Sequence, residues 1–189
     1  MSLENALLGL LIDKPMAGYD LKKILDHPIG FFWAAQMSQI YRELNKLEKK
    51  GLVKSEVEPQ MKRPDRKVYK LTKEGKETFL NWLNRFPNQL SEARRSRFLM
   101  RIFFSSRIEL DEFAFQMKRY KKEKEEGLRY LNKVEQWIKD YSREEKFKDD
   151  TFYWNLIVKK GYKNVAAGME WADECLQLIE QKKRKNKQI

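Results

Sequence analysis

The chain has a single cysteine, Cys175, and a single histidine, His27, among its 189 residues. One cysteine cannot form a disulfide within the chain or build a Cys-rich zinc site. We also find no phosphate-binding loop, no metal-ligand cluster and no Ser/His/Asp arrangement that one histidine would support. We therefore expect no enzyme activity, cofactor or metal site. His27 precedes Pro28 and is interpreted as a helix cap, and Cys175 as a packed interior residue.

Long apolar runs are also absent from the sequence. The run at residues 6–12 is short and contains Gly9, so it fits neither a signal peptide nor a membrane-spanning helix. A lone cysteine is typical of a reducing compartment. We therefore expect a cytoplasmic protein with no membrane partner.

Positive charge is in excess. The chain carries 40 Lys and Arg against 28 Asp and Glu, a formal net charge of +12. Residues 1–86 hold 16 of these cations and 11 of the acids, and residues 182–189 hold five cations and no acid. Such a distribution favours a polyanionic partner, although a generally basic soluble protein would have the same net charge.

The stretch from Ser38 to Leu71 combines an amphipathic helix with a basic hairpin. Ile40, Leu44 and Leu47 share one helix face, and the opposite face is amide-bearing and cationic without a carboxylate. The helix is predicted to end at Gly51, with strands at 52–58 and 67–71. The side chains suited to bases or phosphates are Ser38, Gln39, Arg42, Asn45 and Lys46 on the helix, and Lys62, Arg63, Arg66 and Lys67 in the hairpin. The alternative for the helix residues is an ordinary solvated face.

Helical periodicity flanks this stretch on both sides. Short helices are predicted from the cap residue Ser2 to about Asp13 and around residues 21–25, separated by a turn at Pro15–Gly18. A further helix is predicted to begin after the cap residue Thr72 and to end at Pro87. Three helices, a hairpin and a fourth helix follow the order of a winged helix-turn-helix, which we predict for residues 1–86.

The second half is predicted to be entirely helical, because it lacks proline from Asn88 to Asp173. Helices are predicted at 98–103, 110–141, 152–157 and 165–179, so the fold class is mainly α with a small β-hairpin wing. Residues 91–181 are assigned to a helical dimerisation and effector domain, and 182–189 to a disordered basic tail.

Two of these helices carry apolar residues at 4-3-4-3 spacing, which is a coiled-coil signal. The seam comprises Phe113, Met117, Tyr120, Leu131, Val134, Ile138, Val165, Met169, Ala172, Leu176 and Ile179. Four helices of one chain would be able to bury it, but a helix over 110–141 would be about 48 Å long. That length favours a seam shared between two chains. Four aromatic residues either line a ligand pocket or belong to this core: Trp137, Tyr153, Trp154 and Trp171.

Three segments resemble the PadR family of transcriptional regulators: PMAGYDLKKIL, FFWAAQMSQIYRELNKLEKKGLV and KRPDRKVYKLTKEG. They are most similar to the founding branch, named for repression of phenolic-acid decarboxylase genes. The resemblance implies a homodimer that binds a palindromic operator and releases it on binding a phenolic acid. In the family's motifs, Tyr19 falls in G-Y, Tyr41 in Y-R-E-L, and Lys67 and Tyr69 in K-V-Y, and the resemblance implies DNA contacts from such positions.

We therefore expect a ligand-responsive, homodimeric repressor that acts on double-stranded DNA. No motif identifies its ligand-binding residues. The alternative function is a protein-interaction module that uses the winged helix as a scaffold without reading a DNA sequence, because a fold does not determine a function.

Overall fold

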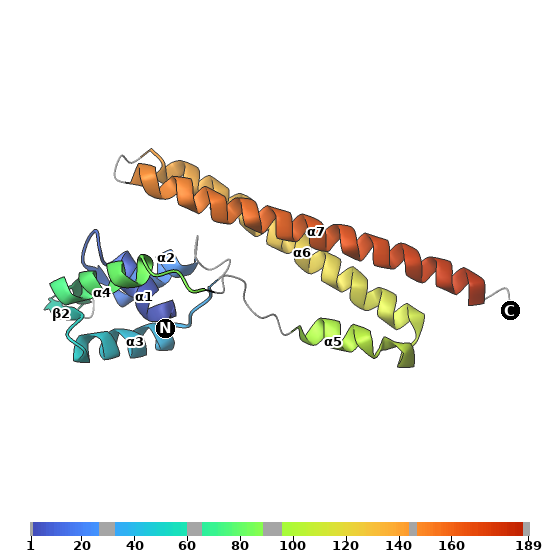
Figure 1. Cartoon of the computed structure of the whole chain (residues 1–189), viewed down its shortest axis with the longest axis horizontal. Coiled ribbons are helices and arrows are strands. Elements are labelled where there is room, and N and C mark those ends of the chain that lie inside the picture. The colour runs from blue at the N-terminus through green and yellow to red at the C-terminus, as the bar shows by residue number, and fades with distance from the viewer. Residues whose placement is uncertain (1, 27–32, 60–65, 89–95, 144–146, 187–189) are drawn as a thin grey trace. The chain divides into compact units, whose positions relative to one another are not determined.

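The computed structural model describes residues 2–26, 33–59, 66–88, 96–143 and 147–186. The chain forms two compact units, Met1–Glu92 and Ala93–Ile189. In chain order, the elements of the first unit are α1 (Ser2–Leu10), β1 (Met16–Ala17), α2 (Gly18–Ile24), α3 (Met37–Lys49), β2 (Val53–Glu58), β3 (Arg66–Leu71) and α4 (Lys73–Leu83), as labelled in part in Figure 1. This unit is the expected winged helix.

Its sheet has three antiparallel strands in the order β1-β3-β2. The hairpin of β2 and β3, which we call the wing, pairs from Val53 with Leu71 to Glu58 with Arg66. Strand β1 adds to the other side of β3, where Met16 pairs with Tyr69. The prediction of a simple turn over Pro15–Gly18 was therefore wrong, because a strand of two residues is too short to show an alternating pattern.

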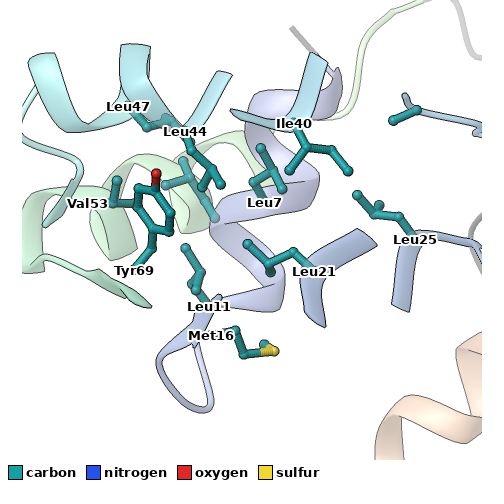
Figure 2. Close-up of a cluster of buried hydrophobic side chains, with 12 residues drawn as sticks. Leu7, Leu11, Met16, Leu21, Leu25, Ile40, Leu44, Leu47, Val53 and Tyr69 are labelled. Carbon is teal, nitrogen blue, oxygen red and sulfur yellow. The ribbon is translucent and has the colours of Figure 1, made fainter. Parts of the chain in front are cut away.

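The core of this unit fixes the orientation of α3. Its residues Ile40, Leu44 and Leu47 are fully buried, as the periodicity predicts. They pack in a cluster to which the neighbouring elements contribute Leu7, Leu11, Met16, Leu21, Leu25, Val53 and Tyr69 (Figure 2). Because each buried leucine stabilises the fold by roughly 1.5–3 kcal/mol, α3 is held with its opposite face outward.

One turn joins the end of α3 to the wing and to α4. Gly51 has φ of 71°, a conformation that glycine adopts without strain. The carbonyl oxygen of Leu52 accepts hydrogen bonds from the N–H of Thr72 at 3.1 Å and from its hydroxyl at 3.0 Å. The Thr72 hydroxyl oxygen in turn accepts from the N–H of Gly75 at 3.0 Å. The predicted helix end at Gly51 and the predicted cap at Thr72 are both confirmed.

The second unit contains α5 (Arg97–Phe103), a short 3-10 helix η2 (Ser105–Arg107), α6 (Leu110–Tyr141) and α7 (Lys148–Asn186). Helices α6 and α7 lie side by side as a long antiparallel hairpin (Figure 1). The prediction of separate helices at 152–157 and 165–179 was wrong, since both belong to α7. The polar segment between them, including Gly161, continues the helix because it contains no proline.

Helix α7 also extends into the segment that we assigned to the tail. Residues 182–186 are helical, which corrects the prediction of disorder for them. Lys183 explains this extension, because its ammonium group lies 2.6 Å from Asp111 at the start of α6 and 3.1 Å from Glu180. Cationic side chains are also favourable at a helix C-terminus.

The coiled-coil seam lies within one chain. Met117, Leu131 and Ile138 of α6 are buried, as are Val165 and Ala172 of α7. These buried residues thus follow the alternative in which one chain buries the seam, and a contact of the seam residues with a second chain stays a prediction. Heptad spacing requires a partner helix but does not specify which chain supplies it, and here α6 and α7 are each other's partner.

Candidate nucleic-acid interface

The outward face of α3 presents the predicted contact residues together. Ser38, Gln39, Arg42, Asn45 and Lys46 are all exposed. Within the described ranges, no protein group pairs with the side chains of Arg42 and Asn45. Lys46 lies 3.2 Å from Glu43. The side-chain oxygen of Gln39 accepts from the N–H of Gln36 at 2.8 Å, so it caps the helix.

Of the four hairpin cations predicted as contacts, the two that the structure describes, Arg66 and Lys67, are both paired within the protein. Lys67 lies 3.0 Å from Glu48 of α3, and its ammonium group is 5.0 Å from the centre of the Tyr69 ring. Arg66 forms an ion pair with Asp20 of α2. Both cations remain accessible, with side-chain exposures of 41% and 42%. Lys62 and Arg63, also predicted as contacts, lie outside the described residues.

Two of the three tyrosines in the family motifs, Tyr19 and Tyr41, are exposed, whereas Tyr69 is buried in the core. Tyr19 is 57% exposed, with the ammonium group of Lys23 at 4.7 Å from its ring centre. Tyr41 is 40% exposed, and its ring covers Gly18 so closely that an added Cβ would lie 2.6 Å from a ring carbon. Gly18 thus allows α2 and α3 to approach each other, which is the contact that sets a helix-turn-helix.

Sequence reasoning did not identify Glu48, although it joins α3 to the wing. Its carboxylate accepts from the N–H of Ser55 at 3.1 Å, from the Ser55 hydroxyl, and from Lys67 at 3.0 Å. The hydrogen bonds from Ser55 and Lys67 lower the pKa of Glu48. The hydrogen bond to Glu48 raises the pKa of Lys67. Helical periodicity carries no signal for such a contact, because Ser55 lies beyond the helix.

The aromatic residues considered for one ligand pocket do not form one group. Trp137 and Trp154 pack with their ring centres 5.4 Å apart, near the turn between α6 and α7. Trp171 instead contacts Tyr120 at 5.3 Å, near α5. Tyr153 is 63% exposed. The three tryptophans therefore pack against the core of the helical unit, which was the alternative to a ligand pocket.

Cys175 and His27 were also predicted to have structural roles. Burial raises the pKa of the half-buried Cys175 thiol, which agrees with a packing role. His27 lies outside the described residues.

Among the residues that the structure describes, no group of three or more His, Cys, Asp or Glu is arranged to hold a metal. No helix in those ranges is long and apolar enough to cross a membrane.

Known proteins resemble this chain over nearly its full length. Residues 7–81 match the "Transcriptional regulator PadR-like family", and residues 94–180 match "Virulence activator alpha C-term". The negative transcriptional regulator PadR of Bacillus subtilis (strain 168) is 26% identical over 94% of this chain and 97% of its own length.

Two solved structures of Bacillus subtilis PadR extend the comparison. The complex with operator DNA has a TM-score of 0.78 and 26% identity, covering 95% of this chain and 99% of that one. The complex with p-coumaric acid has a TM-score of 0.72 at the same identity and the same coverage. These matches agree with the motifs around Tyr19, Tyr41 and Lys67. Residues 7–81 belong to the PadR-like family of transcriptional regulators, and the chain as a whole is similar to the Bacillus subtilis member of that family.

Proposed function

We propose that this protein represses transcription by binding double-stranded operator DNA through α3 and the wing. The observation that carries the proposal is the outward face of α3, where Arg42 and Asn45 are exposed and unpaired among the described residues. Arginine reads guanine and asparagine reads adenine in the major groove. Ser38, Lys46 and the wing cations are suited to the phosphate backbone. The operator complex of the Bacillus subtilis relative supports this proposal.

Substituting Arg42 with alanine tests the base-reading role. If Arg42 contacts a base edge, Arg42→Ala loses about 1–3 kcal/mol of operator affinity and relaxes preference at one position of the site. Binding titrations against the operator and against base-substituted operators, at several salt concentrations, would measure both effects. Lys76→Ala is the matched control, because it removes one cation from α4. Unchanged affinity and preference in Arg42→Ala would remove Arg42 from the interface.

We further propose that the repressor is a homodimer on a palindromic operator, since two-fold symmetry presents two recognition helices to two half-sites. Because α6 and α7 bury most of the seam against each other, we place the second chain on another surface of the helical unit. Among the described residues of the second unit, two segments each carry four exposed apolar side chains. The α5 patch consists of Leu99, Met100, Phe103 and Phe104, and the α7 patch of Phe152, Tyr153, Leu156 and Ile157.

The two patches lie at opposite ends of the α6–α7 hairpin. Helix α5 packs through Phe98 and Ile102 beside the start of α6 and the end of α7. The α7 patch lies at the other end, where Trp154 and Val158 pack against α6. In an antiparallel two-fold pair, each α5 patch would meet the partner's α7 patch, and both contacts would form at once. Exposed apolar groups of this size favour a protein partner, here a second copy.

A phenolic acid is the effector that we propose, following the p-coumaric acid complex of the Bacillus subtilis relative. We propose that the dimer has two arrangements, which differ in the separation of the two α3 helices. A ligand that binds the helical unit better in the arrangement that does not fit the operator would lower the fraction of dimers able to bind DNA.

We expect p-coumaric acid at saturation to weaken operator binding by about 5- to 150-fold, the usual range of allosteric coupling. Titration of the operator with and without the ligand would measure the factor. Cinnamic acid, which lacks the phenol hydroxyl, is the matched control, because a site that hydrogen-bonds a hydroxyl discriminates against its absence. Equal operator affinity with and without p-coumaric acid would reject it as the effector.

A further inference from the structure

The wing is joined to α3 by one carboxylate that bonds both of its strands. Glu48 accepts from Ser55 of β2 and from Lys67 of β3. Strand β2 is at the edge of the sheet, and the N–H of Ser55 donates to this carboxylate rather than to another strand. Charge-assisted hydrogen bonds of this kind are roughly twice as strong as neutral ones. The contact therefore restrains the wing relative to the helix.

We propose that Glu48 is a positioning residue that holds the wing at a fixed angle to α3 and so contributes to operator specificity. The proposal rests on the proposed function, in which α3 and the wing contact the same DNA. Phosphate contacts set the register of a protein on the duplex, and base contacts then read the sequence. A wing that moves relative to α3 would bind phosphates in several registers, which would improve non-specific binding at the expense of the operator.

A carboxylate beside a phosphate-binding surface also has a direct electrostatic effect. It repels phosphates and neutralises Lys67, so its removal strengthens binding to any DNA sequence. The loss of positioning acts in the opposite direction and only on the operator. The ratio of operator affinity to non-specific affinity separates the two effects, because the electrostatic effect cancels in that ratio.

The test compares Glu48→Ala with Glu43→Ala. Glu43 is on the same helix and pairs with Lys46, so each variant removes one carboxylate and releases one lysine. Both variants are expected to bind non-specific DNA more tightly. Glu48→Ala is expected to lower the specificity ratio by about tenfold, comparable to one mismatched base pair, whereas Glu43→Ala leaves it unchanged. Equal ratios in the two variants would overturn the proposal.

Three further measurements exclude a purely structural effect. The Ser55 amide is expected to exchange its hydrogen faster in Glu48→Ala at unchanged melting temperature. Glu48→Gln retains an acceptor oxygen and is expected to recover part of the specificity ratio. Ser55→Ala is expected to lower the ratio in the wild-type background and to add no further loss to Glu48→Ala. Fully additive losses would show that Glu48 acts independently of Ser55 and would contradict the proposal.

Failure of this inference is distinguishable from failure of the proposed function. If Arg42→Ala lowers operator affinity while Glu48→Ala and Glu43→Ala keep equal ratios, α3 reads DNA and only the role of Glu48 is rejected. If wild-type protein and Arg42→Ala bind operator and non-specific DNA equally, the proposed function itself is rejected.

Discussion

Replacing Leu156 with glutamate is expected to separate the proposed homodimer into monomers and to weaken operator binding by about a hundredfold or more. Leu156 is 49% exposed in the single chain, so the substitution leaves the α6–α7 packing intact. In the dimer it would bury an unpaired carboxylate, which is strongly unfavourable. A monomer binds only one half-site. It therefore loses the affinity that a dimer gains when its second α3 binds the other half-site at high effective concentration. Sedimentation and operator titration would measure the two effects.

Asn155→Glu is the matched control for this experiment. Asn155 is the adjacent exposed residue of α7 and is not part of the α7 patch, so the same charge is added beside the proposed interface. It is expected to remain dimeric. A dimer that persists in Leu156→Glu would exclude the α7 patch as the interface. A wild-type monomer at micromolar concentration would exclude dimerisation altogether.

Gly75→Ala is expected to destabilise the first unit by roughly 3 kcal/mol. A Cβ at this position would overlap the carbonyl oxygen of Leu52 and lie 3.0 Å from its carbon. That carbonyl cannot move away without breaking its hydrogen bonds to Thr72, which join α4 to the base of the wing. Denaturant unfolding followed by circular dichroism would give the change in free energy of unfolding.

Gly127→Ala provides the comparison, because it adds the same methyl group in a helix with room for it. Its Cβ would lie 3.6 Å from a methyl carbon of Val165, an ordinary contact. Alanine is favoured over glycine inside a helix by about 1 kcal/mol, so this variant is expected to be equally or more stable. If Gly75→Ala had the same midpoint denaturant concentration of unfolding as the wild-type protein, the close contact with Leu52 would not constrain α4.

The first unit was largely predictable because its signals are local. The spacing of Ile40, Leu44 and Leu47 determines which side of α3 is buried, and therefore which side is exposed. Gly51 and Thr72 mark element ends through backbone geometry and capping, which depend on neighbouring residues. The exposed contact residues of α3 follow from these features alone.

Other features depend on contacts between distant segments. Periodicity identifies the seam on α6 and α7 but does not reveal that one chain supplies both helices. Glu48 has the sequence context of an ordinary helical surface residue, and only the folded hairpin brings Ser55 and Lys67 to it. The ion pair of Lys183 with Asp111 similarly joins two helix ends that are far apart in the chain.

Because Tyr41 contacts Gly18 closely, the residue types allowed at position 18 depend on the residue at position 41. Any side chain at residue 18 would collide with the ring, so glycine is required there for as long as residue 41 is aromatic. A smaller residue at 41 would remove that requirement and would also open the space between α2 and α3. Related sequences should therefore vary at positions 18 and 41 together, and this covariation would trace the angle of the recognition helix across the family.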